Sequence, residues 1–226
     1  SPRLIGLSDG NQLFIQHISL QPKLYIFGGG HISLPLAELG KMLGFYVAVI
    51  DERYEFANEQ RFTSADQVIC QSFEKAVTEI EYLPDNYYVI VTRGHLYDRM
   101  CLEAVLQHPF AYVGMIGSRS KIKVVMNYML ANGYDQSLLD QAHSPVGLDI
   151  GAQTPAEIAV CIAAEIIQVK NQRLGHSFMD EGLLKYLQDP AQPAALVTII
   201  EKTGSSPRAA GTQMLVLKDG SFLGTI

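Results

Sequence analysis

A glycine-rich stretch followed about twenty residues later by an aspartate could bind a phosphate and a ribose. In KLYIFGGGHIS, Gly28 and Gly30 occupy the first two positions of a G-x-G-x-x-G pattern, and Ser33 occupies the third. Such glycines let the chain turn sharply out of a strand and approach a phosphate closely, although they could also serve packing alone. Asp51 lies where a carboxylate can bind a ribose hydroxyl, and Arg53 beside it could contact a phosphate or simply be solvated. The first candidate binding residues are Gly28, Gly29, Gly30, His31, Asp51 and Arg53.

Polar residues also follow two later apolar runs, YYVIVT and AYVGMI. Ligands of open α/β sheets bind at the carboxyl ends of strands, so both polar segments should lie where a ligand binds. Glycine, hydroxyl groups and cations after the second run indicate an anion site. The same polar groups could instead bond to one another and only shape the loops. The candidates added here are Thr92, Arg93, His95, Asp98, Gly117, Ser118 and Arg119.

Short apolar runs alternate with segments of helical periodicity through most of the chain. Buried parallel strands read as near-continuous apolar runs, which predicts strands at residues 24–27, 45–50, 67–70, 87–92 and 111–116. Helices are expected at residues 34–43, 73–83, 100–107, 122–132 and 155–167, the last opened by a capping box. We therefore predict an α/β fold, a Rossmann-like parallel sheet of five or six strands with helices on both faces.

The two ends of the chain have a β pattern instead. Residues 13–18, 196–201, 213–217 and 221–225 read as strands, and two or three strands cannot bury a face alone, so the first of them is a candidate partner for the others. We expect a β tail of a small domain at 1–21, the Rossmann-like domain at 22–175, a linker with a short helix at 176–193, and a partial β segment at 194–226.

Composition narrows the class of protein. The chain has 226 residues, 48% of them hydrophobic, and a net charge of −6, which disfavours a dedicated nucleic-acid binder. No apolar run approaches the length that spans a bilayer. The three cysteines have no C-x-x-C spacing, which fits a reducing compartment. We expect a cytoplasmic protein without a metal site, a membrane segment or a nucleic-acid partner.

Several motifs together make the sequence resemble the XdhC/CoxI family, maturation factors for xanthine dehydrogenase and related molybdenum hydroxylases. The motifs are IFGGGH, VIDER, TRGH with Asp98, YVGMIGSRSK and SPVGLDIGAQTPAEIAVCIAAEI. The segment VTIIEKTGSSPRAAGTQMLVLKDGSFLGTI is similar to the family's other, β-rich domain. The resemblance implies that Ser205, Ser206 and Arg208 of GSSPR also contact the ligand, although Ser206-Pro207 could equally be an ordinary turn.

The resemblance implies a cofactor chaperone rather than an enzyme. Such a protein binds the molybdenum cofactor and assists its sulfuration and insertion into a xanthine dehydrogenase-type hydroxylase, with a cysteine desulfurase as a further partner. Separately, the incomplete strand segments at both ends of the chain indicate a homodimer. The family usually places the GSSPR domain first, so we expect a rearranged or duplicated order, or an excised piece. The family's cysteine-bearing turn is missing, which argues against direct sulfur chemistry by this chain.

Two other functions remain open from the residues alone. One is an NAD(P)-dependent oxidoreductase, in which His95 is the general acid and Asp98 orients it. The other is a non-catalytic nucleotide-sensing module. The shortness of the chain outside the Rossmann-like part argues against a dehydrogenase, which needs a substrate pocket.

Overall fold

The computed structural model describes residues 3–15, 17–19, 21–172, 176–178, 181–189, 193–201 and 210–224. The chain divides into two compact units. The larger unit is Pro22–Gln172, and the smaller unit combines Ser1–Gln21 with Arg173–Ile226.

A six-stranded parallel sheet forms the centre of the larger unit, in the order β6-β5-β4-β7-β8-β9. This confirms the predicted α/β fold with a Rossmann-like sheet. The last strand was not predicted, because two residues are too few to show a pattern. The strands are β4 (Lys23–Phe27), β5 (Tyr46–Asp51), β6 (Gln67–Cys70), β7 (Tyr87–Ile90), β8 (Tyr112–Met115) and β9 (Ala142–His143).

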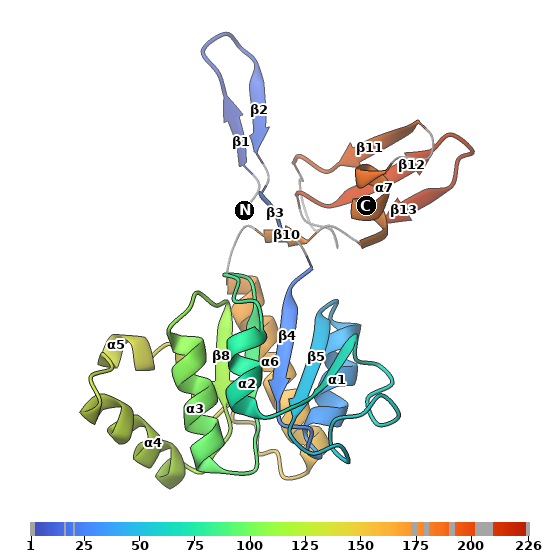
Figure 1. The fold of residues 1–226 in the computed structure, drawn as a ribbon. Coiled ribbons are helices and arrows are strands. Elements are labelled where there is room, and N and C mark those ends of the chain that lie inside the picture. The colour runs from blue at the N-terminus through green and yellow to red at the C-terminus, as the bar shows by residue number, and fades with distance from the viewer. Residues whose placement is uncertain are drawn as a thin grey trace. The chain divides into compact units, whose positions relative to one another are not determined.

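Helices cover both faces of this sheet, as Figure 1 shows. Side chains alternate along a strand, so Leu24 and Ile26 of β4 face one layer while Tyr25 and Phe27 face the other. The first layer contains α1 (Ser33–Met42) and α6 (Pro155–Gln172). The second contains α2 (Phe73–Glu79), α3 (His95–Leu106), α4 (Arg119–Ala131) and the short α5 (Gln136–Leu139). The central strands are therefore buried on both faces, as their apolar runs predicted.

Four predicted helix boundaries are wrong, among them the end of α6, which lies at Gln172 rather than at residue 167. Helix α3 begins at His95 rather than at residue 100, and α4 begins at Arg119 rather than at residue 122. Their first turns are polar, and we read polar residues as loop. Helix α2 ends at Glu79 rather than at residue 83, because Ile80 is extended. His95, Asp98 and Arg119 consequently lie in the first turns of helices rather than in loops.

The described residues of the smaller unit form short strands and one helix. Strands β1 (Arg3–Gly6) and β2 (Gln12–Ile15) form an antiparallel hairpin, and β3 (His17–Ser19) pairs in parallel with β10 (His176–Phe178). The strand predicted at 13–18 thus corresponds to β2 and β3. In the described residues β2 pairs with β1 and β3 pairs with β10, rather than with β11, β12 or β13. A separate antiparallel sheet contains β11 (Ala194–Thr198), β12 (Gln213–Leu217) and β13 (Phe222–Gly224), as the β pattern predicted. Residues 176–193, expected to be a linker with a short helix, contain that helix as α7 (Glu181–Gln188) and also the strand β10.

Candidate functional site

The carboxyl ends of β4, β5, β7 and β8 lie along one edge of the sheet. The chain runs from β4 to β5 on one side and from β7 to β8 on the other, so the strand order reverses between β4 and β7. Such a switch point is where ligands bind in open α/β sheets. This carboxyl edge carries the predicted residues 28–31, 51–53, 92–98 and 117–119.

The three glycines of the turn differ in what they require. Gly28 has a φ of +107°, and a Cβ there would lie 2.4 Å from the carbonyl oxygen of Val91. A Cβ on Gly29 would lie 1.9 Å from the carbonyl oxygen of Phe56. A Cβ on Gly30 meets no described atom within 4 Å. Packing therefore explains the first two glycines, and only Gly30 of the three faces open space, next to the exposed His31.

Asp51 is fully buried and already uses its carboxylate within the protein. It accepts hydrogen bonds from the Gly29 N–H at 2.9 Å, from the Arg53 N–H at 3.0 Å, and from Arg53 Nε and Nη2 at 2.9 Å. Burial alone would raise the pKa of Asp51, but the hydrogen bonds from Arg53 and Gly29 bring that pKa below its usual value. Four bonds occupy the accepting capacity of a carboxylate. In this structure Asp51 therefore fixes the glycine turn and Arg53 rather than standing open to a ribose.

The segment after Asp51 packs directly on the glycine turn. Arg61 donates from Nε to the carbonyl of Gly29 at 3.2 Å and from Nη2 to the carbonyl of Gly30 at 3.3 Å. The Arg53 guanidinium stacks 3.7 Å from the ring centroid of Phe56. Arg61 and Phe56 were not predicted as site residues, because a charged segment after a strand looks like a solvated loop.

A second buried carboxylate follows β7. Asp98 accepts from Thr92 Oγ1 at 2.6 Å and from the Thr92 N–H at 3.2 Å, and its Oδ2 lies 3.0 Å from Lys121 Nζ. Burial raises the pKa of Asp98, and the contacts with Thr92 and Lys121 offset only part of that effect. Among the described residues, Asp98 thus contacts Thr92 and Lys121 rather than the exposed His95, so the expected His95–Asp98 pair is not seen.

Arg93 connects two strand ends across the edge. Its Nη2 lies 2.8 Å from Glu52 Oε1, which follows β5, and the Arg93 side chain is otherwise largely exposed. Arg119 lies further along the edge and is 90% exposed, with Asp149 at 3.9 Å. The structure therefore holds the glycine turn to Asp51, links the segments after β5 and β7 through Glu52 and Arg93, and leaves Arg119 outside these contacts.

An open pocket of about 580 Å³ lies at the carboxyl end of β8. One wall is the turn of Gly117, Ser118 and Arg119, and the other is residues 145–152 with the start of α6. Residues 145–152 were not among the predicted site residues. The signal that could have found them was the motif SPVGLDIGAQTPAE, which contributes to the family resemblance.

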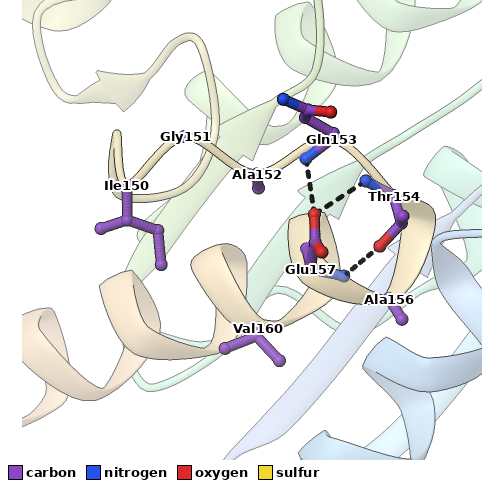
Figure 2. Close-up of a pocket in the computed structure, with 8 residues that line it drawn as sticks. All are labelled: Ile150, Gly151, Ala152, Gln153, Thr154, Ala156, Glu157 and Val160. Atoms are coloured by element: carbon purple, nitrogen blue, oxygen red, sulfur yellow. Dashed lines mark hydrogen bonds between the residues drawn. The ribbon is translucent and has the colours of Figure 1, made fainter.

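A neighbouring pocket of about 550 Å³ shares Ile150, Gly151 and Ala152 with the first. Figure 2 shows that its polar groups bond to one another. Glu157 accepts from the N–H groups of Gln153 and Thr154, and the Thr154 hydroxyl accepts from the Glu157 N–H. This is the predicted capping box, and it places a carboxylate of the protein itself at the start of α6.

The remaining predictions concern the GSSPR segment, a metal site and a membrane segment. Ser205, Ser206 and Arg208 fall outside the described residues. Among the residues that the structure does describe, no group of three or more His, Cys, Asp or Glu side chains is placed to hold a metal ion. None of the described helices has the length and apolar character needed to cross a membrane.

Two family models match this chain. The XdhC Rossmann domain matches residues 24–166, and the XdhC and CoxI family matches residues 187–226. The first match covers the sheet, its helices and the whole carboxyl edge described above.

Known proteins match about 68% to 74% of this chain. The uncharacterized protein YqeB of Escherichia coli (strain K12) is 34% identical over 168 residues, which is 74% of this chain and 31% of that protein. A probable xanthine dehydrogenase subunit from Bacillus subtilis (strain 168) is 34% identical over 160 residues, 71% of this chain and 46% of that protein. A crystal structure of a xanthine dehydrogenase from Bacillus halodurans matches with a TM-score of 0.61 and 31% identity, over 68% of this chain and 44% of that one. The chain therefore spans less than half the length of these relatives.

Proposed function

Because this chain belongs to the XdhC and CoxI family, we propose that it is an accessory factor of a xanthine dehydrogenase-type molybdenum hydroxylase. In this proposal the chain binds the molybdenum cofactor as cargo and assists its sulfuration and its insertion into the hydroxylase. Two of its relatives carry the name xanthine dehydrogenase, which supports the choice of partner.

The observation that carries the proposal is the pocket of about 580 Å³ at the carboxyl edge of the sheet. Molybdopterin is a ring system with a phosphate, and it often carries a nucleotide. The edge offers a cation, a hydroxyl and glycine backbone in Arg119, Ser118 and Gly117, beside apolar side chains. Mixed pockets of this volume at such an edge are typical small-molecule sites.

The structure supports a nicotinamide dinucleotide less well. Binding of its ribose by Asp51 would have to replace hydrogen bonds from Arg53 or Gly29. The proposed general acid, His95, also lacks the expected contact with Asp98 in the described residues. We therefore favour the chaperone function over the oxidoreductase and the nucleotide-sensing module. A cysteine desulfurase as partner, a homodimer and a cytoplasmic location stay predictions.

The experiment that tests this function is the activation of a cofactor-free xanthine dehydrogenase-type hydroxylase. The hydroxylase is mixed anaerobically with the molybdenum cofactor, with and without the full chain, and the appearance of activity is followed over time. We expect activity to appear several-fold faster with the chain than with the same concentration of serum albumin. Equal rates with the chain and with albumin would contradict the proposal.

A further inference from the structure

Four cations at the carboxyl edge are held by close partners. Breaking a partly buried pair leaves a charge without its partner, so these side chains are poorly available to an anionic ligand. Arg119 differs, because its ion pair with Asp149 is long, at 3.9 Å, and both side chains are about 90% exposed. Exposed pairs of this kind contribute little to stability. The four held contacts are Arg53 with Asp51, Arg61 with the carbonyls of Gly29 and Gly30, Arg93 with Glu52, and Lys121 with Asp98.

Arg119 also lies at a favourable end of a helix. It begins α4, a helix of 13 residues that has no acidic residue in its first turn, and Ser118 is the N-cap. Negative charge is stabilised near such an end. The neighbouring pocket at the start of α6 is different, because there the Glu157 carboxylate takes the N–H groups of Gln153 and Thr154. An anion is therefore favoured in the pocket of Ser118 and Arg119 and disfavoured in the neighbouring pocket beside Glu157.

Apart from Asp149, the rest of the pocket lining is uncharged and suits an uncharged body. Its lining contains the apolar side chains Ile116, Val146, Leu148 and Ile158, together with Gly147 and Gly151. Apolar walls with a few polar groups bind the bulk of a small molecule and fix its orientation. The pocket thus matches a ligand that has an anionic group attached to a flat or apolar body.

A buried carboxylate holds the wall that contains Val146 and Gly147. Glu165 of α6 accepts from the Tyr112 hydroxyl of β8, from the Gly147 N–H at 2.9 Å, and lies 3.2 Å from His143 Nδ1. Gly147 has a φ of +93°, and a Cβ there would lie 3.0 Å from Cys161 Cβ. The Glu165 network therefore ties this wall to both the sheet and α6, so the pocket wall is held in place before a ligand arrives.

We propose that residues 116–119 and 145–152 form the ligand-binding subsite, with Arg119 binding the anionic group and Glu165 acting as a positioning residue for the opposite wall. The inference rests on the proposed function and specifies which part of the carboxyl edge receives the cargo. Arg119 binds the phosphate of the pterin cofactor, and the apolar walls receive the ring system. The glycine turn at residues 28–30 then serves mainly to pack β4, β7 and the segment of Arg53–Arg61.

The test is an anaerobic binding titration of the full chain with two probes, the molybdenum cofactor and 6-hydroxymethylpterin, which has no phosphate. We expect Arg119→Ala to weaken cofactor binding about tenfold, as loss of a charge-assisted contact does, and to leave binding of the phosphate-free pterin unchanged. Lys123→Ala is the matched control, because it removes one exposed positive charge from the same helix outside the pocket. Equal cofactor affinities for the Arg119→Ala and Lys123→Ala chains would overturn the inference.

For Glu165 we expect a different pattern of affinities for the two probes, because this residue acts through the pocket wall. We expect Glu165→Gln to weaken the binding of both probes about fivefold, in a chain whose circular dichroism shows native folding. If that variant does not fold, Tyr112→Phe removes one of the three contacts and should weaken both probes about twofold. A folded variant that binds both probes like the natural chain would overturn the positioning role.

Failure of the subsite and failure of the function are distinguishable in these titrations. If the natural chain binds the cofactor and Arg119→Ala changes nothing, the subsite is wrong and the proposed function stands. If the natural chain binds neither probe, both proposals fall.

Discussion

Two buried aspartates at the carboxyl edge differ in how the protein treats their charge. Asp51 receives four hydrogen bonds, three of them from Arg53, and its pKa is lowered despite burial. Asp98 is equally buried, and burial outweighs Thr92 and Lys121, so its pKa is raised. Since a pKa difference between the folded and unfolded states makes stability depend on pH, the two residues should give opposite pH dependence.

Asp51→Asn should destabilise the protein at neutral pH. The folded-state pKa of Asp51 lies below its unfolded value of 3.8, so its stabilising effect is present above that value and is lost as the pH falls through the folded pKa. Loss of the charge weakens the bonds from Arg53, which should lower the free energy of unfolding by about 2 kcal/mol at pH 7. Urea denaturation at pH 7 and pH 3.5 measures this. An equal loss of unfolding free energy at both pH values would contradict the lowered pKa of Asp51.

Asp98→Asn should have the opposite pH dependence. The folded-state pKa of Asp98 lies above 3.8, so its contribution is fully present below that value and is lost as the pH rises through the folded pKa. At pH 7 we expect Asp98→Asn to cost less than about 1 kcal/mol, because asparagine can still accept from Thr92 and removes a buried charge. Asp98→Ala leaves Thr92 without its acceptor and should cost about 2 kcal/mol. Equal losses of unfolding free energy for Asp98→Asn and Asp98→Ala, measured by urea denaturation, would contradict this prediction.

Residue types and spacing predicted which side chains lie on the carboxyl edge, but not how they pair. Arg53 folds back on Asp51, two residues away, and Asp98 bonds to Thr92 and Lys121 instead of to His95. Such choices depend on side-chain direction, which helix starts and loop conformations decide. The sequence spacing alone does not contain them.

At the scale of elements, the glycine turn is a junction between β4, β7 and the segment after β5. Gly28→Ala should lower the free energy of unfolding by at least about 2 kcal/mol, because alanine disfavours a φ of +107° and its Cβ would lie 2.4 Å from the Val91 oxygen. Gly30→Ala is the matched control and should change stability by less than about 1 kcal/mol, because its Cβ meets no described atom within 4 Å. Thermal or urea denaturation that gives equal costs for both variants would contradict this description.

Strands of the larger unit were easier to predict than helix starts. Strands buried on both faces show as apolar runs, and β4 was found within one residue of its observed limits. The helices α3 and α4 begin with polar turns that precede their apolar periodicity, so we placed their starts too late. This shift matters for the site, because it moved Asp98 and Arg119 from loops into first turns of helices. The wall at residues 145–152 has no periodicity, and only the motif similarity pointed to it.

At the scale of the whole molecule, the two units differ in how much core they have. Two large clusters of buried side chains, one on each face of the sheet, belong to Pro22–Gln172. The described core of the smaller unit is centred on Leu183 and Leu215, with Tyr186, Leu217 and Leu223 against it. The β pattern at both ends of the chain indicated strands there, but it did not predict that β3 pairs with β10, because strand partners depend on contacts far apart in the sequence.

The larger unit should fold without the rest of the chain. A fragment of residues 22–172 retains the sheet, its helices and both core clusters, and a domain of that size can bury enough surface to be stable alone. We expect one cooperative urea transition, with a midpoint close to that of the most stable transition of the full chain. A fragment without cooperative unfolding would show that residues 1–21 or 173–226 are needed for its core.

The most direct measurement of the central claim is an anaerobic calorimetric titration of the purified chain with the molybdenum cofactor and, separately, with NADH. The carboxyl edge has an open pocket beside Arg119, while Asp51 is occupied by Arg53, so we predict micromolar or tighter binding of the cofactor and no comparable binding of NADH. Binding of NADH without binding of the cofactor would contradict the claim and favour an oxidoreductase.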